Sequence, residues 1–283
     1  MHERDMSDFI LKNGEKLRYE DTGAGEETVV MLHGWTSTRK VFASALPAIS
    51  RAARCITFDF RGHGDSRRAN RDTVTLDTLA GDLDELIRGL GLHDITLLGW
   101  SMGAAVALSY ASAYGCGSLR QLILCDMTPR LLNGGDWTLG LDREKLTRAD
   151  TLEEIEADLF PLFRRFSAET IPKLAGIPDV LLWLPLKRRL AACDEGVLAS
   201  LAFSMKETDL RPCVEEITVP VTYFYAVPGS LFSPALADWY GAHVKTPFRS
   251  VAFPHSTHIL IREHPRRFAR EVIRALDREG GGP

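Results

Sequence analysis

A serine between two glycines is the feature of this sequence with the clearest chemistry. The motif Gly-Trp-Ser-Met-Gly at residues 99–103 follows an apolar run at 95–98 and precedes a stretch of small residues at 104–113. This context favours a buried strand that turns tightly into a helix. A serine on such a turn has a strained backbone, and its hydroxyl group is exposed at the end of the sheet. The helix N-terminus that follows favours negative charge on an oxyanion. We therefore expect Ser101 to be a nucleophile.

Two further segments follow apolar runs in the same way. His-Gly-Trp at residues 33–35 comes directly after the run at 28–32. Arg-Gly-His-Gly-Asp-Ser at residues 61–66 comes shortly after the run at 54–59. If these runs are parallel strands, both segments lie at the same edge of the sheet as the serine turn.

The histidines of these two segments could suggest a metal site. His33 and His63 have Asp59 and Asp65 nearby in the sequence, and all four side chains are of types that bind metals. The His-x-His and His-x-x-x-His spacings are absent from both segments. We therefore expect no metal here.

With these segments the chain resembles the α/β-hydrolase fold superfamily, and within it the capped, esterase-like branch. The resemblance runs from about residue 9 to residue 276 and includes the strings MLHGW, FDFRGHGDS, LLGWSMGAAVAL and STHILIREHPRRF. It implies that the backbone N–H groups of Trp35 and Met102 form the oxyanion hole, and that His33 and His63 brace the loops around the site. It also implies a catalytic triad in the chain order nucleophile, acid, histidine.

The resemblance places the general base late in the chain, where the candidates are His243, His255, His258 and His264. The family pattern after the last strand is Gly-His, with Glu five residues and Pro seven residues after the histidine. His258 has Glu263 and Pro265 at these offsets, so it is the expected base. Thr257 stands where the family usually has Gly, and His255 is the alternative base.

The acid is the position at which this sequence departs from the commonest family pattern. Most relatives carry the triad Asp in the loop after the strand that residues 221–226 represent, but residues 227–234 contain no carboxylate. Asp238 falls in an apparent helix, where the helix dipole favours an exposed carboxylate in the first turn. The other placement known for the fold is occupied by Asp126, and a carboxylate that ends a buried strand needs a partner such as an imidazole N–H. We expect Asp126 to be the acid, with capping of the next segment as the alternative.

Short apolar runs alternate with longer helical patterns along the chain, which is typical of an α/β sheet. An opening hairpin is expected around Asn13-Gly14. Its strands lie at residues 8–11 and 17–21, and further strands are expected at 28–32, 54–59, 95–98, 119–125, 221–226 and 248–253. Helices lie between them, for example at residues 76–90, where apolar residues follow a 3.6-residue period. The predicted fold class is α/β, with the eight-stranded, mostly parallel α/β-hydrolase sheet flanked by helices.

Strand patterns disappear between residues 127 and 212, where proline-interrupted helical segments take their place. We interpret residues 127–212 as a helical cap inserted after the sixth strand, so that residues 1–126 and 213–283 form the core domain. The large apolar residues of the cap either pack it onto the sheet or, in part, line an apolar acyl pocket between cap and sheet. They are Trp137, Phe160, Phe163, Phe166, Leu181, Leu182, Trp183 and Leu186.

Composition and charge are those of an ordinary soluble globular protein. The 283 residues are 45% hydrophobic, and 34 Lys and Arg stand against 38 Asp and Glu, which excludes general disorder and a charge excess for nucleic acid. The five cysteines lack Cys-x-x-Cys spacing and are expected to be reduced, buried thiols. The N-terminus has no signal-peptide pattern, and the uncharged stretch at 95–119 is interpreted as a strand and a helix. We expect a cytoplasmic protein with neither a membrane nor a nucleic-acid partner.

These features together predict a serine hydrolase that cleaves a carboxylic ester or a related acyl compound through an acyl-enzyme. No cofactor is expected, because Ser101, His258 and Asp126 supply the chemistry. A thioesterase or lactonase with the same triad is the alternative within enzymes. In that case the basic residues at 164–165 and 187–189 could meet an acidic carrier protein that bears the acyl group. A non-catalytic receptor for a small ligand is the alternative outside enzymes, and a monomer or small homo-oligomer is expected.

Overall fold

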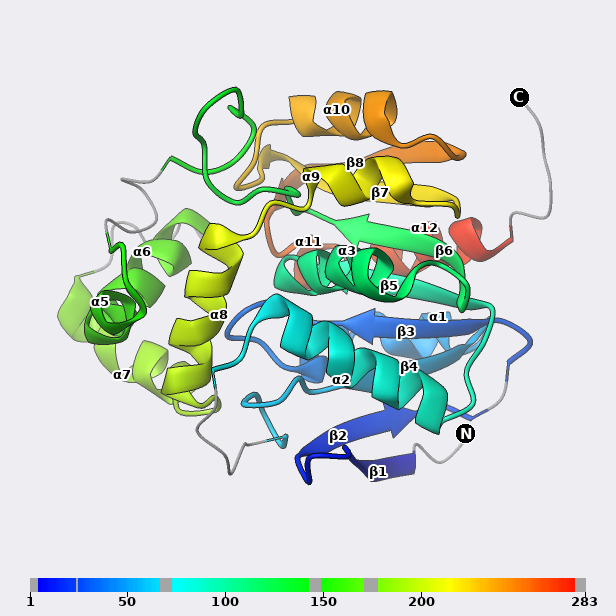
Figure 1. Ribbon diagram of the computed structural model, residues 1–283, viewed down its shortest axis with the longest axis horizontal. Coiled ribbons are helices and arrows are strands. Elements are labelled where there is room, and N and C mark those ends of the chain that lie inside the picture. Colours follow the sequence, from blue (N-terminus) through cyan, green and yellow to red (C-terminus); the bar gives the residue numbers. More distant parts are fainter. Residues whose placement is uncertain (1–4, 24, 67–72, 143–148, 171–177, 278–283) are drawn as a thin grey trace.

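An eight-stranded sheet in the order β1-β2-β4-β3-β5-β6-β7-β8 forms the centre of the computed structural model (Figure 1). The structure describes residues 5–23, 25–66, 73–142, 149–170 and 178–277. Strands β3 to β8 pair in parallel, whereas β2 pairs antiparallel with both β1 and β4. The strands are β1 Asp5–Ile10, β2 Lys16–Asp21, β3 Thr28–Leu32, β4 Arg54–Phe58, β5 Ile95–Trp100, β6 Leu119–Cys125, β7 Val221–Gly229 and β8 Phe248–Thr257. The predicted eight-stranded, mostly parallel sheet is confirmed.

Two groups of helices cover the two faces of this sheet. Along β3 the side chains of Val30 and Leu32 belong to one buried cluster, and those of Val29 and Met31 to the other. The first cluster includes residues of α2 Leu76–Gly89, α3 Met102–Tyr114, α9 Arg211–Glu216 and α10 Ala235–His243. The second includes residues of the 3₁₀ helix η1 Arg39–Phe42 and of α1 Leu46–Ile49, α11 Leu260–Glu263 and α12 Pro265–Leu276. Because both faces are covered, inner strands such as β3 and β5 are largely apolar and buried, which is why apolar runs predict them.

Strands β7 and β8 continue further than predicted. Their parallel pairing extends from Val227 opposite Pro254 to Gly229 opposite Thr257. Proline cannot donate a backbone hydrogen bond, so Pro228 and Pro254 indicated strand ends in the sequence. The longer pairing carries the ends of both strands side by side to the edge of the sheet where the serine turn lies.

Between β6 and β7, four of the helices that the structure describes lie beyond one end of the sheet, on the left in Figure 1. They are α5 Leu152–Ala157, α6 Leu159–Thr170, α7 Asp179–Leu190 and α8 Glu195–Glu207. The described residues 127–142 are not helical, which corrects the prediction of helical segments from residue 127. They form a loop with isolated bridges, and its tight turn is Gly135-Asp136 between the bridged residues Gly134 and Trp137, with Gly135 at positive φ. The predicted boundary at residue 212 falls inside α9, which packs against α3.

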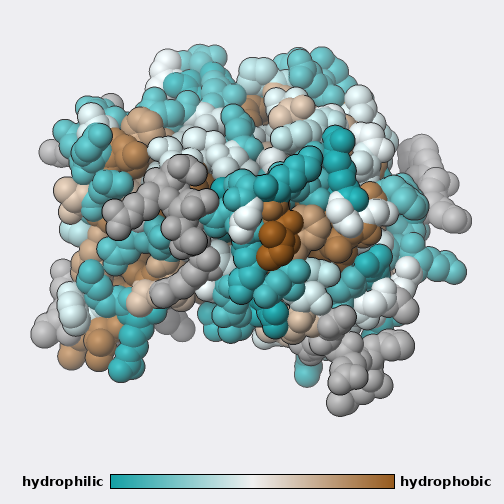
Figure 2. Space-filling model, turned by 60° about the horizontal axis from the view of Figure 1, so that its bottom comes forward, coloured by the Kyte–Doolittle hydropathy of each residue, from teal (hydrophilic) through white to brown (hydrophobic). Residues whose placement is uncertain are grey.

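Hydrophilic side chains cover most of the face that Figure 2 shows, with hydrophobic areas between them. Three of the large hydrophobic side chains that are exposed belong to α7, namely Leu181, Trp183 and Leu184. Among the described helices, none combines the length and apolar character that crossing a bilayer requires. The uncharged stretch at 95–119 instead forms β5, the serine turn and α3.

Candidate active site

Ser101 lies on the tight turn between β5 and α3. Its φ of 55° is in the left-handed region, where a non-glycine backbone is strained. A Cβ on Gly99 would lie 2.3 Å from the Gly103 carbonyl oxygen, and a Cβ on Gly103 would lie 2.3 Å from the Leu32 carbonyl oxygen. Only glycine fits at these two positions, which explains the spacing of the motif.

Ser101, His258 and Asp126 form one buried chain of hydrogen bonds. His258 Nε2 lies 2.8 Å from Ser101 Oγ, and His258 Nδ1 lies 2.7 Å from Asp126 Oδ2. The three residues are 7%, 2% and 0% exposed, respectively. A carboxylate only accepts hydrogen bonds, so the ring proton lies on Nδ1 and leaves Nε2 free to accept the serine proton. This is the arrangement of a nucleophile, a general base and an orienting acid.

Asp126 begins the loop after β6 with a φ of 50°. Its Oδ1 accepts hydrogen bonds from the backbone N–H of Ala226 at 3.2 Å and from Ser230 Oγ at 2.7 Å. Together with His258, these donors satisfy a carboxylate that has no access to solvent. Asp238 is exposed on α10, away from the hydrogen bonds that join Ser101, His258 and Asp126.

The loop that carries His258 is held by Glu263. One carboxylate oxygen of Glu263 accepts from Thr257 N at 2.7 Å and the other accepts from Thr257 Oγ1 at 2.9 Å. This contact gives a physical reason for the five-residue offset between His258 and Glu263. His255, the alternative base, is exposed.

Two residues that hydrogen-bond to His258 or Asp126, namely Trp100 and Ser230, were not identified from the sequence. Trp100 Nε1 donates to the His258 carbonyl oxygen at 2.8 Å, and the two rings lie 5.5 Å apart. Ser230 donates to Asp126, as described above. Their sequence positions could have pointed to them. Trp100 directly precedes Ser101, and Ser230 lies in the loop after β7 that contains no carboxylate.

The predicted oxyanion donors belong to two segments next to Ser101. Met102 is the first residue of α3, where backbone N–H groups have no partner within the helix. Gly34, next to Trp35, is so close that a Cβ on it would lie 3.0 Å from Ser101 Cβ. The Trp35 indole donates to the Leu198 carbonyl oxygen at 3.0 Å, which ties this loop to α8.

His33 and His63 are fully buried and neutral. Burial lowers the pKa of His33 to about 4 and that of His63 to about 3. His33 Nε2 accepts from the Phe60 N–H at 3.0 Å, and its Nδ1 lies 2.8 Å from the Gly34 carbonyl oxygen, so the ring links two loops of the site. Within the described part of the chain, no cluster of three or more metal-binding side chains is present.

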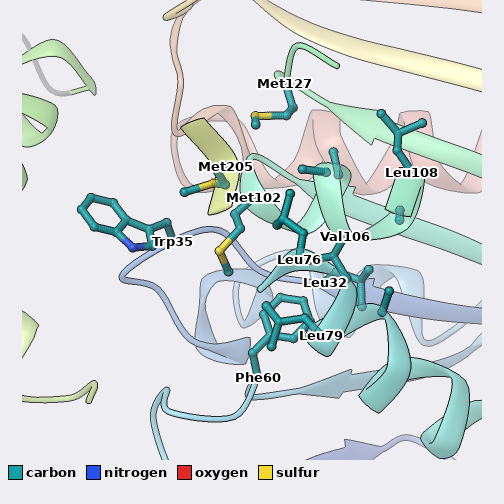
Figure 3. Packing of buried hydrophobic residues seen from close by; sticks show 14 of the residues in the cluster. Leu32, Trp35, Phe60, Leu76, Leu79, Met102, Val106, Leu108, Met127 and Met205 are labelled. Carbon is teal, nitrogen blue, oxygen red and sulfur yellow. The ribbon is translucent and has the colours of Figure 1, made fainter. Parts of the chain in front are cut away.

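A mostly apolar pocket of about 510 Å³, including its open side, adjoins Ser101. Helix α6 supplies Leu162 and Phe166, and α8 supplies Ala202 and Met205. The other lining residues are Trp35, Met127, Leu131, Leu141, Leu231 and Phe232, and Figure 3 shows Trp35, Met127 and Met205 around Met102.

Of the large apolar residues that the sequence suggests as lining, and whose side chains the structure describes, Phe166 is in this pocket. Trp137 instead packs against Trp239, with ring centroids 5.1 Å apart. Trp183 is 52% exposed. Phe163 packs edge-on against Trp35 at 6.2 Å, behind the pocket wall. Neither Trp137 nor Trp183 therefore lines this pocket, which was one of the two alternatives for this set of residues.

Comparisons with known proteins agree with this architecture. Residues 27–164 match the family described as the alpha/beta hydrolase fold. The pimeloyl-[acyl-carrier protein] methyl ester esterase of Nitrosomonas europaea is 27% identical over 255 residues, which cover 89% of this chain and 96% of that protein. An esterase from Exiguobacterium antarcticum superposes with a TM-score of 0.81 at 24% identity, over 96% of this chain and 99% of that one. A bromoperoxidase from Bacillus anthracis superposes with a TM-score of 0.77 at 21% identity, over 98% and 100%.

Proposed function

We propose that the chain is a serine hydrolase of the α/β-hydrolase superfamily and that it cleaves carboxylic esters through a covalent acyl-enzyme. The observation that carries this proposal is the buried chain of hydrogen bonds from Asp126 through His258 to Ser101. The esterases among the relatives support the choice of ester over other acyl compounds.

The geometry supports a two-step reaction. Ser101 Oγ attacks the ester carbonyl carbon while its proton passes to His258 Nε2, and Asp126 stabilises the imidazolium that forms. The N–H groups of Trp35 and Met102 hold the negative oxygen of the tetrahedral intermediate. As the bond to the alcohol breaks, His258 returns the proton to the leaving oxygen. A water molecule then gives a proton to His258 and attacks the acyl carbon. As the bond between Ser101 Oγ and the acyl carbon breaks, His258 returns the proton to Ser101 Oγ and the acid leaves.

The pocket beside Ser101 supports an apolar group on one half of the ester. Apart from Ser101, its lining side chains are apolar or aromatic, so a charged group there would lose its hydration without gaining a partner. Because α6 and α8 complete this wall, we propose that residues 127–212 act as a cap that selects the substrate. The core domain, residues 1–126 and 213–283, carries the triad.

The same triad could open a thioester or a lactone, and an acyl group bound to a carrier protein is the second candidate substrate. The relative from Nitrosomonas europaea is named for such a substrate. The structure favours it less, because basic residues of the cap make contacts within the protein. Arg165 pairs with Asp158, Lys187 lies over the Phe160 ring, and Arg189 lies over the Phe163 ring. A non-catalytic receptor is disfavoured, since binding alone does not require a serine hydrogen-bonded to a buried imidazole.

Replacing Ser101 tests the proposal directly. Ser101→Ala is expected to lower turnover of p-nitrophenyl acetate and butyrate by roughly 10⁴-fold or more, as for other nucleophiles that act as a unit with their base. A fluorophosphonate probe should label the wild type and leave this variant unlabelled. Ser112→Ala, on the exposed side of α3, is the matched control that keeps both activity and labelling. Activity of Ser101→Ala within tenfold of the wild type would refute the assignment. CoA thioesters of the same chain lengths distinguish an esterase from a thioesterase.

A further inference from the structure

The loop that carries the Trp35 N–H group has a strained backbone. This oxyanion loop, residues 33–37, is closed by a hydrogen bond of 3.2 Å from the Ser37 N–H to the Gly34 carbonyl oxygen. Thr36 is the third residue of the turn and has a φ of 57°. Glycine is usual at such a position, and a β-branched residue in this region is an outlier. The conformation therefore persists only where neighbouring groups hold the loop in place.

Two side-chain hydrogen bonds join the oxyanion loop to the helices between β6 and β7. Trp35 Nε1 donates to the carbonyl oxygen of Leu198, in α8, at 3.0 Å. Arg189 Nε, at the end of α7, donates to the Thr36 carbonyl oxygen at 3.4 Å. The Arg189 guanidinium also lies 5.5 Å from the centroid of the Phe163 ring, which packs edge-on against Trp35. Helices α6, α7 and α8 thus all contact the oxyanion loop or a residue that touches it.

Helix α8, which runs across the end of the sheet in Figure 1, is itself fixed near both of its ends. At its start, the Asp194 N–H donates to the Gly62 carbonyl oxygen at 2.7 Å. A Cβ on Gly62 would lie 2.7 Å from Val197 Cβ, so only glycine permits this close approach. In its last turns, Ser204 Oγ accepts from the Leu76 N–H at 3.0 Å. The acceptor of the indole N–H therefore has a fixed position relative to the sheet.

A shift of the oxyanion loop would act directly on the chemistry. A Cβ on Gly34 would lie 3.0 Å from Ser101 Cβ, so the loop and the nucleophile are immediate neighbours. Stabilisation of the negative oxygen requires donors at about 2.7–3.1 Å from its position. The groups that hold the loop therefore also set how well the Trp35 N–H meets the transition state.

We propose that residues 127–212 position the oxyanion hole, with the Trp35 indole and Arg189 as the positioning groups. The indole N–H and the guanidinium hold the oxyanion loop, and the loop holds the Trp35 backbone N–H at the negative oxygen. This inference rests on the proposed ester hydrolysis. It gives the cap a part in turnover in addition to its part in substrate selection.

Trp35→Phe tests the first contact, because it removes the indole N–H and keeps an aromatic ring in the pocket wall. We expect kcat for p-nitrophenyl acetate to fall roughly tenfold and KM to change less than twofold. Loss of an oxyanion donor itself costs roughly 10²- to 10³-fold, and here the backbone N–H remains. Trp137→Phe is the matched control and should keep kcat, because the Trp137 indole also donates to a backbone carbonyl, that of Arg130, but lies outside the pocket.

A transition-state analogue separates positioning from a merely structural role. In the adduct of 1,1,1-trifluorobutan-2-one, Ser101 Oγ bonds to the carbonyl carbon, the serine proton passes to His258, and the carbonyl oxygen becomes negative. Its Ki should rise roughly tenfold in Trp35→Phe, by the same factor as kcat falls. Both are expressed per site that a fluorophosphonate labels at completion. A structural role would lower the melting temperature and the number of labelled sites but leave Ki and kcat per site unchanged.

Arg189→Met tests the second contact from the cap side, and it keeps a long apolar side chain beside Phe163. We expect kcat to fall and Ki to rise roughly threefold, less than for Trp35→Phe because this hydrogen bond is longer. Arg188→Met, at the exposed neighbouring position of α7, is the matched control and should change neither value.

The proposal requires a difference within each pair of variants, so equal kcat and Ki values in either pair would overturn it. A raised KM with unchanged kcat in Trp35→Phe would also overturn it, because the indole would then serve only as a pocket wall. In both cases, ester hydrolysis by the wild type that is lost in Ser101→Ala would leave the proposed function standing. A wild type without ester hydrolysis would refute the proposed function itself.

Discussion

Replacing Asp126 by asparagine tests the acid of the proposed triad, because the structure dictates how the amide must lie. Oδ1 of Asp126 accepts from two donors, Ala226 N–H and Ser230 Oγ. The amide oxygen of the introduced asparagine would stay on that side, since its NH₂ group cannot accept these hydrogen bonds. The NH₂ group would then point at His258 Nδ1, so the ring proton moves to Nε2 and faces Ser101. His258 in that tautomer cannot accept the serine proton.

The expected loss of activity follows from two contributions. The productive tautomer of His258 requires the opposite orientation of the amide, which leaves a buried N–H group without a partner. This costs about 1–3 kcal/mol, so the productive tautomer makes up roughly one tenth to one hundredth of the population. Loss of the charged hydrogen bond to the imidazolium removes about 1.5–3 kcal/mol more in the transition state. Together they predict that Asp126→Asn lowers kcat by roughly 10²- to 10⁴-fold, within the range known for such triads.

The assay compares kcat on p-nitrophenyl butyrate with the melting temperature from circular dichroism. Asp126→Asn should shift the melting temperature by only a few degrees, because the amide has nearly the shape of the carboxylate and keeps two of its contacts. Asp238→Asn is the matched control on exposed α10 and should be nearly silent. If Asp126→Asn retained more than a tenth of wild-type kcat, or if Asp238→Asn lost more, our choice of acid would be wrong.

Three further outcomes are expected. His258→Ala should lower kcat by roughly 10⁴-fold and His255→Ala by less than twofold. The reverse result would make His255 the general base. Trp100→Phe removes the donor to the His258 carbonyl, so kcat should fall roughly tenfold with KM little changed, for a buried acceptor left without its partner. An unchanged kcat would assign Trp100 to packing alone. Burial lowers the pKa of His63 from 6.5 to about 3, so the unfolded chain takes up the proton first, and stability falls as the pH drops below about 6.5. In urea unfolding between pH 7 and pH 5, the wild type should lose about 2 kcal/mol more than His63→Asn, and equal losses would contradict the neutral, buried state.

The sheet could be predicted from the sequence because its signals are local. A buried parallel strand is a short apolar run, and the inner strands β3 and β5 are largely such runs. The exceptions have local causes too. Pro228 and Pro254 hid the continued pairing of β7 and β8, and the helical interpretation of residues 127–142 overlooked the turn at Gly135-Asp136. A turn of this kind overrides the apolar residues around it.

The neighbourhood of Ser101, Asp126 and His258 could be predicted, because the C-terminal ends of parallel strands meet at one edge of a sheet. The residues that line the pocket could not. Phe166 and Trp183 are both large and apolar, and the sequence gives no reason to prefer one. Helix α6 turns Phe166 toward His258, whereas Trp183 on α7 is 52% exposed. Which face of a cap helix meets the core depends on packing between distant segments, and no local pattern records it.

The order of the strands explains why a serine stands in the loop after β7, where most members of the superfamily that this chain resembles carry an aspartate. Strand β7 lies between β6 and β8, so an acid at the end of β6 must reach across the end of β7 to meet His258. Asp126 does so, and the Ala226 N–H and Ser230 hydroxyl that it meets on the way both belong to β7 and its loop. A carboxylate at position 230 would face that of Asp126 at the distance of a hydrogen bond, and two buried carboxylates repel each other. A small donor is what this position requires once the acid is on β6. The absence of an aspartate from residues 227–234 is therefore the complement of Asp126 rather than a gap in the site.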